Sequence, residues 1–138
     1  MASPTTEIQF PVELLIDSQL QRGEGPTETI LNPATGAQLC VVNEASPDQV
    51  TRAVSAAHRA FASWSQTTPG ERAGLLLKLA DAIEQRAEQF SRLESLNCGK
   101  PYARALGDEI PAIADCFRFF AGAARAQTGA VAGEYLAG

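Results

Sequence analysis

The sequence is poor in the side chains on which most catalytic and metal sites depend. It has a single histidine, His58, and three cysteines, Cys40, Cys98 and Cys116, with no Cys-x-x-Cys pair. An odd number of widely spaced cysteines predicts reduced thiols rather than a disulfide framework or a zinc site. A nucleophilic pair of Cys98 and His58 would need a second helix to bring the histidine in, so we expect Cys98 to pack at a helix end. An enzyme complete within this chain is therefore disfavoured.

Clusters of basic residues and long apolar runs are also missing. With 11 Lys and Arg against 16 Asp and Glu, the chain has a formal net charge of −5, which argues against nucleic acid or an anionic membrane as a partner. Neither an apolar run of about 18 residues nor the N-terminal pattern of a signal peptide is present. The cytoplasm is the expected compartment. A hydrophobic content of 45% over 138 residues predicts one globular unit, or part of one.

The first third of the chain predicts short antiparallel strands. Residues 1–10 are mostly polar and terminal and are expected to be disordered, whereas residues 11–138 form the folded segment. β-Prone runs alternate with turn signals rich in glycine and proline. We expect strands at Val12–Ile16, Thr29–Leu31 and Gln38–Val42, with turns at Gln21–Pro26 and Asn32–Gly36. Together they predict a small antiparallel meander.

Two helices with similar start signals follow. Ser46 and Thr68 are each followed by a proline and, three residues on, by Gln49 or Glu71. This is the pattern of a capping box with proline at the first helical position. Apolar residues recur at helical spacing along one side of each predicted helix, so each helix needs a partner surface to cover that side.

The last part of the chain predicts further helices with one interruption. A helix is expected to end at Gly99, which tolerates a positive φ, because Pro101 cannot continue it. Gly107 and Pro111 then fall within a second helical pattern. We expect a break or kink near Asp108–Pro111.

Several of these segments resemble one enzyme family. Residues Leu93–Pro101, Leu-Glu-Ser-Leu-Asn-Cys-Gly-Lys-Pro, resemble a segment found early in NAD(P)-dependent aldehyde dehydrogenases. The Asn32–Gly36 turn, the Ala-Phe-x-x-Trp motif at Ala60–Trp64 and the aromatic stretch Phe117–Ala121 are similar to the family's motifs, in the same order. The resemblance runs from about Leu15 to the last residue, and among subfamilies it looks most like bacterial 4-aminobutyraldehyde dehydrogenases.

The resemblance implies an α/β fold of which this chain is the N-terminal part. Short antiparallel strands would be followed by four or so helices that pack on a Rossmann-like sheet encoded downstream. Residues 11–138 would then be the N-terminal segment of the cofactor-binding domain, truncated before the nucleotide-binding and catalytic regions. The fragment itself is expected to contain no catalytic or cofactor-binding residue and to be inactive.

For the full-length protein, the resemblance implies oxidation of an aldehyde to an acid with NAD. A Cys thiolate attacks the carbonyl, hydride passes to NAD, and a Glu-activated water hydrolyses the thioester. The nucleophilic Cys in its Gly-Gln/Glu-x-Cys setting and the general-base Glu are not in this sequence. The expected substrate is 4-aminobutanal, oxidised to 4-aminobutanoate, and the expected assembly is a homodimer or homotetramer.

Two groups of residues are site candidates by resemblance. Relatives hold a monovalent cation at positions that match the main chain of Ile30 and Leu31 and the side chain of Asn97, where an aspartate is commoner. Helix capping is the alternative role for Asn97. Asp108 and Glu109 match carboxylates that line the substrate channel of plant aminoaldehyde dehydrogenases. The alternative role for this pair is interaction with a helix macrodipole near the predicted break.

A different class of function stays open at this stage. The amphipathic helices could serve as the docking surface of a helical protein-interaction module without catalysis. The coding sequence beyond Gly138 distinguishes the two, because only an enzyme needs the Cys and Glu motifs there.

Overall fold

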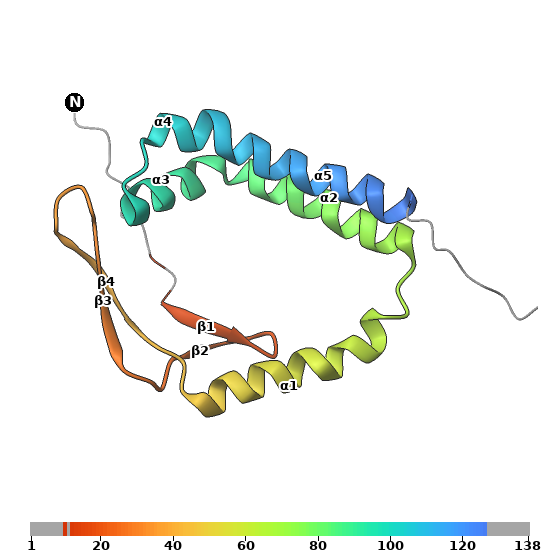
Figure 1. Cartoon of the computed structure of the whole chain (residues 1–138), viewed down its shortest axis with the longest axis horizontal. Helices are drawn as coiled ribbons and strands as arrows, with labels where there is room; N and C mark the ends of the chain where they lie inside the picture. The colour runs from red at the N-terminus through yellow and green to blue at the C-terminus, as the bar shows by residue number, and fades with distance from the viewer. Residues whose placement is uncertain (1–9, 11, 127–138) are drawn as a thin grey trace, which may run out of the picture.

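The structure is a computed structural model that describes residue 10 and residues 12–126. Strands come first along the chain, as β1 (Glu13–Ile16), β2 (Gln19–Arg22), β3 (Thr27–Leu31) and β4 (Gln38–Asn43). Helices follow, as α1 (Pro47–Trp64), α2 (Pro69–Gln85), α3 (Ala87–Cys98), α4 (Tyr102–Arg104), the π-helix η1 (Ala105–Glu109) and α5 (Ile110–Ala126). The predicted order of short antiparallel strands and then helices is confirmed (Figure 1). The disorder expected for residues 1–10 lies outside the described residues, apart from Phe10.

The predicted three-stranded meander is wrong, because the strands form two separate hairpins. β1 pairs with β2 and β3 pairs with β4, each pair antiparallel. Between β1 and β2 the chain turns through Asp17 and Ser18, whose φ angles are 52° and 61°. Two successive positive φ values suit the twist of a tight hairpin, but glycine or asparagine is the usual signal for them. The pair Asp17-Ser18 gives no such signal, so the sequence does not reveal β2, and the turn predicted at Gln21–Pro26 overlaps its end.

The second hairpin and its turn are confirmed. The Oδ1 atom of Asn32 accepts a hydrogen bond of 2.9 Å from the Ala34 N–H, and Gly36 has a φ of 70°. Both features are typical of a turn built on asparagine and glycine. The register between β3 and β4 shifts between Ile30 and Leu31, which marks a β-bulge at the end of β3.

Both predicted capping boxes are present. Ser46 and Thr68 accept hydrogen bonds from the N–H groups of Gln49 and Glu71, whose side chains bond back to the N-cap N–H groups at 3.0 and 2.7 Å. The bonds from the Thr68 backbone and hydroxyl lower the pKa of Glu71. The two helices therefore begin where local side-chain chemistry places them.

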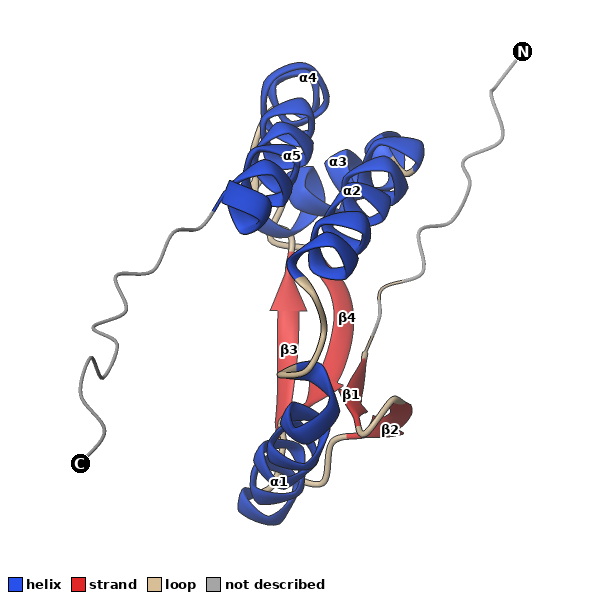
Figure 2. Cartoon of the chain, turned by 90° about the vertical axis from the view of Figure 1, so that its right-hand side faces the viewer, coloured by secondary structure: helices blue, strands red, loops and turns tan. Residues whose placement is uncertain are grey.

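The closest helix packing is between α2 and α5, which run side by side (Figures 1 and 2). Ala80 and Ala114 are fully buried in these two helices, and their small side chains allow close approach of the backbones. Arg118 of α5 bonds to Asp81 and Glu84 of α2 at 2.8 and 2.7 Å. Its hydrogen bond lowers the pKa of Glu84. Packing of small residues and this ion network together hold the two helices in register.

The break or kink expected near Asp108–Pro111 takes the form of a π turn within a continuous helical path. The N–H of Ile110 bonds to the carbonyl of Ala105, five residues earlier. In a regular α-helix the ring of Pro111 would clash with the carbonyl four residues before it. The wider π turn just ahead of Pro111 offers a way to relieve this clash, so the chain remains helical through η1 into α5.

Large apolar side chains remain exposed on the helices. Helix α1 lies apart from the α2 and α5 pair and packs against β1 (Figure 1). Its Phe61 and Trp64 side chains, which the sequence assigns to a core, are 62% and 46% exposed. Similar exposure is found for Val50, Val54, Leu75, Leu79, Ile113, Phe119 and Phe120. The predicted need for a partner surface is therefore not met within residues 12–126. None of the helices in this described range has the length and hydropathy needed to cross a membrane.

Candidate functional site

Three of the predicted site residues, Ile30, Asn97 and Glu109, are connected with the C-terminal end of α3. Gly99 ends this helix with a φ of 74°, as predicted. A Cβ atom at Gly99 would lie 3.0 Å from Cγ of Pro33, in the turn between β3 and β4. The hairpin turn and the helix end are therefore in close contact, and the glycine is needed for both its backbone angle and its small size.

A pocket of about 250 Å³ lies between this hairpin and α3. It is lined mostly by apolar side chains, with one carboxylate and one amide, from Phe10, Ile30, Cys40, Val42, Leu93, Glu94 and Asn97. The structure thus brings Ile30 and Asn97, two of the three candidate cation ligands, to one pocket. Leu31 does not line it and is exposed, although the β-bulge lies between Ile30 and Leu31.

Asn97 makes little contact with the rest of the helix end. The N–H of Gly99 bonds to the carbonyl of Ser95 and so closes the helix through the main chain. The Asn97 amide is exposed and lies 3.8 Å from the sulfur of Cys98. Its oxygen therefore remains available to a ligand at the pocket. The residues present fit a monovalent cation in part, through carbonyl and amide oxygen rather than charge.

Glu109, one of the two candidate channel carboxylates, is part of an ion network. Nζ of Lys100 lies 2.6 Å from Oε2 of Glu109 and 3.0 Å from Oε1 of Glu94. Hydrogen bonds to Glu109 and Glu94 raise the pKa of Lys100 to about 12. Lys100 thus stays protonated at neutral pH and joins the end of α3 to η1.

Asp108, the other candidate, lies in a different setting. It bonds to Arg104 at 2.8 Å, and the two side chains are 59% and 76% exposed. Asp108 lies in the first turn of η1, but the continuous helical path that contains both carboxylates begins earlier, after Pro101, so neither lies in the first turn of that path. Because the macrodipole acts mainly within the first turn, the geometry does not favour that alternative role for Asp108 and Glu109.

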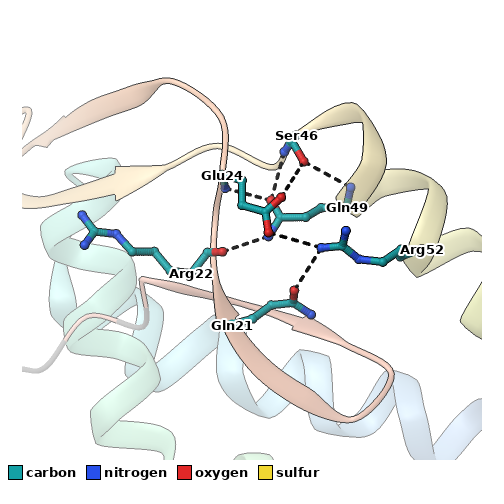
Figure 3. Close-up of polar contacts among 6 residues, drawn as sticks. All are labelled: Gln21, Arg22, Glu24, Ser46, Gln49 and Arg52. Atoms are coloured by element: carbon teal, nitrogen blue, oxygen red, sulfur yellow. Dashed lines mark hydrogen bonds and ion pairs between the residues drawn. The ribbon is translucent and has the colours of Figure 1, made fainter.

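A buried glutamine at the start of α1 forms a junction that the sequence does not reveal. The Gln49 side chain is fully buried and accepts hydrogen bonds from the N–H groups of Glu24 (2.8 Å) and Ser46 (3.0 Å). Its Nε2 donates to the carbonyl of Arg22 at 2.8 Å, and Arg52 adds an exposed contact with Glu24 (Figure 3). Gln49 therefore ties the loop after β2 to the start of α1. The capping pattern identifies the contact with Ser46, but no local signal points to the other two.

No group of three or more His, Cys, Asp or Glu side chains placed to hold a metal ion occurs within the described residues. Cys40, Cys98 and Cys116 are not paired in disulfides. The polar groups gathered near the end of α3 are carboxylates, an amide and the Lys100 ammonium.

Comparison with known proteins gives a consistent answer. The profile of the aldehyde dehydrogenase family matches residues 21–136. An aldehyde dehydrogenase of Alternaria alternata is 36% identical over 125 residues, which are 88% of this chain and 25% of that protein. The crystal structure of PnpE in complex with nicotinamide adenine dinucleotide superposes with a TM-score of 0.83 at 38% identity, over 88% of this chain and 25% of that one. Betaine aldehyde dehydrogenase from Staphylococcus aureus, solved with NAD⁺, gives a TM-score of 0.78 at 32% identity, over 85% of this chain and 24% of that one.

The matched part is small relative to these proteins. The chain spans about a quarter of the length of the Alternaria protein and of the two solved structures. The short strands and helices described above correspond to the N-terminal part of those folds. About three quarters of the length of each of these proteins therefore lies outside the segment that this chain matches.

Proposed function

The chain belongs to the aldehyde dehydrogenase family, and on that premise we propose that it forms the N-terminal part of an enzyme that oxidises an aldehyde with NAD. The observation that carries the proposal is the fold match over 88% of the chain to a relative solved with the dinucleotide. NAD, when bound, would accept the hydride. In this proposal residues 11–138 are the N-terminal segment of the cofactor-binding domain, and the nucleotide and catalytic contacts come from the remainder of the protein.

The role of this segment would then be to support the cofactor-binding domain. Its exposed apolar helix faces need other residues to cover them. About three quarters of the relatives' length lies outside the matched segment and could supply those residues. The same faces would suit a protein-interaction module, but the family match favours the enzyme. We also propose a homodimer or homotetramer in the cytoplasm, a reducing compartment that suits three free cysteines.

For the substrate we propose an aldehyde with a cationic group at its far end, such as 4-aminobutanal. The Gly-Lys-Pro segment and the motifs that follow it resemble aminoaldehyde enzymes, and Asp108 and Glu109 supply carboxylates just after that segment. Betaine aldehyde dehydrogenase, one of the structural relatives, acts by its name on an aldehyde that has a permanent positive charge. A carboxylate near the channel entrance attracts such a substrate, by about 1 kcal/mol if exposed to water.

Substitution of these carboxylates tests the substrate assignment. In the whole gene product, Asp108→Asn or Glu109→Gln is expected to raise KM for 4-aminobutanal by about twofold to fivefold. Butanal, which has the same chain length without the amine, should keep its KM. The measurement is the rate of NADH formation as a function of the concentration of each aldehyde. Equal changes for both aldehydes, or none for either, would contradict the assignment.

We further propose that the main chain of Ile30 and Leu31, with the side chain of Asn97, holds a monovalent cation. An amide oxygen brings no charge, so Asn97→Asp should strengthen cation binding in the whole gene product. The expected result is a larger rise in Tm on adding KCl or NaCl for the Asn97→Asp variant than for the unmodified protein, relative to choline chloride at equal ionic strength. The same Tm rise with choline as with the inorganic cations would exclude a specific site.

A further inference from the structure

Lys100 forms ion pairs on both sides of the segment that leads into the π turn η1, which contains Asp108. Its ammonium bonds to Glu94, in the last turns of α3, and to Glu109, the last residue of η1. Lys100 itself is only 32% exposed, and the two carboxylates share its single charge. One side chain therefore fastens the π turn to the end of α3.

The π turn needs such support because its geometry is less favourable than that of an α-helix. The hydrogen bond of a π turn spans one more residue than that of an α-helix, and such turns are rare and often lie at functional sites. Any return of η1 to α-helical hydrogen bonding would rotate the residues within it, Asp108 among them, relative to α5. The contact between Lys100 and Glu109 opposes that change, because Glu109 would lose its partner.

The two neighbouring carboxylates differ in how readily they could release their partners. Glu109 is held at 2.6 Å by a half-buried lysine that also binds Glu94. Asp108 pairs with Arg104, and both of these side chains are mostly exposed. Exposed pairs of this kind contribute little and exchange readily with other ions. Asp108 is therefore the carboxylate more available to a cationic ligand.

We propose that Lys100 is a positioning residue that fixes the π turn and so presents Asp108, rather than Glu109, to the cationic end of the substrate. The inference rests on the proposed function for the identity of the substrate, but the hold of Lys100 on η1 does not depend on it. Two readouts separate these parts: amide hydrogen exchange of η1, which needs no substrate, and KM for a charged and an uncharged aldehyde.

The principal variant is Lys100→Met in the whole gene product. Loss of the contact should speed amide exchange in residues 105–109 by about tenfold. It should also raise KM for 4-aminobutanal severalfold, with kcat and the KM for butanal almost unchanged. The direction of the change in KM is informative. If Lys100 acted only through its positive charge, its removal would reduce repulsion of the cationic substrate and lower KM. Lys100→Arg should restore both properties. Lys78→Met, which removes the charge of an exposed lysine on α2, should alter neither.

A double-mutant cycle completes the test. It also provides a second variant of the same contact in case Lys100→Met folds poorly. Glu109→Gln should speed exchange in η1 as much as Lys100→Met, and the double variant should do no more than either alone. Asp108→Asn should raise KM for the amine without changing exchange. Unchanged exchange, additive effects of the first two substitutions, or a fall in KM for 4-aminobutanal in Lys100→Met would overturn the proposal. If amide exchange in η1 changes as expected but Asp108→Asn affects both aldehydes equally, the substrate assignment is refuted and the hold of Lys100 on η1 is not.

Discussion

The 138-residue chain produced by itself is expected to reduce no NAD with any aldehyde. The catalytic Cys and Glu motifs that the family resemblance implies are not in this sequence, and the relatives are about four times as long as the part that this chain matches. The isolated chain should also bind a hydrophobic dye strongly and unfold over a broad temperature range. Phe61, Trp64, Phe119 and Phe120 are all exposed, and such apolar faces remain uncovered without the rest of the protein.

The measurements are NADH absorbance with a panel of aldehydes, dye fluorescence and thermal unfolding followed by circular dichroism. The whole gene product is the positive control for activity and the negative control for dye binding. Aldehyde-dependent NADH formation by the isolated chain, or a sharp cooperative transition without dye binding, would contradict the expectation.

The substitution Gln49→Leu is expected to cause a large loss of stability. The variant leaves three main-chain groups without their partner: the N–H groups of Glu24 and Ser46 and the carbonyl of Arg22. A buried polar group without a partner costs roughly 1 to 3 kcal/mol, so the loss in the free energy of unfolding should be about 3 kcal/mol or more. The Tm of the whole gene product should fall by several degrees.

Two further variants make the measurement specific to the hydrogen bonds of Gln49. Gln49→Glu keeps the acceptor oxygen but loses the donor to the Arg22 carbonyl and buries a charge, so it should also lower Tm. Arg52→Gln removes only exposed contacts of 3.4 Å, one of them with Glu24, and should change stability by less than about 0.5 kcal/mol. If Gln49→Leu proves as stable as Arg52→Gln, then Gln49 is not the junction described here.

Features that depend on neighbouring residues could be predicted from the sequence. The capping boxes at Ser46 and Thr68 involve side chains and backbone groups three residues apart, so every interacting group lies within four consecutive residues. The same holds for the Asn32–Gly36 turn and for Gly99, whose positive φ ends α3. Local patterns therefore determine where α1 and α2 begin and where α3 ends.

Features that join distant residues could not be predicted in this way. Gln49 bonds to a carbonyl 27 residues earlier in the chain, and the sequence around it carries no sign of that contact. The separate hairpin of β1 and β2 escapes prediction because Asp17 and Ser18 adopt positive φ values without glycine. Ile30 and Asn97 are grouped through family resemblance rather than from spacing, and the structure places both at one pocket.

The most direct test of the central claim is to determine the coding sequence beyond the Gly138 codon. If this chain is the N-terminal part of an aldehyde dehydrogenase, the reading frame continues for several times the length of this segment and encodes a cysteine in a Gly-Gln/Glu-x-Cys setting together with a general-base glutamate. A stop codon directly after Gly138, in a transcript from which the protein is made, would contradict the claim.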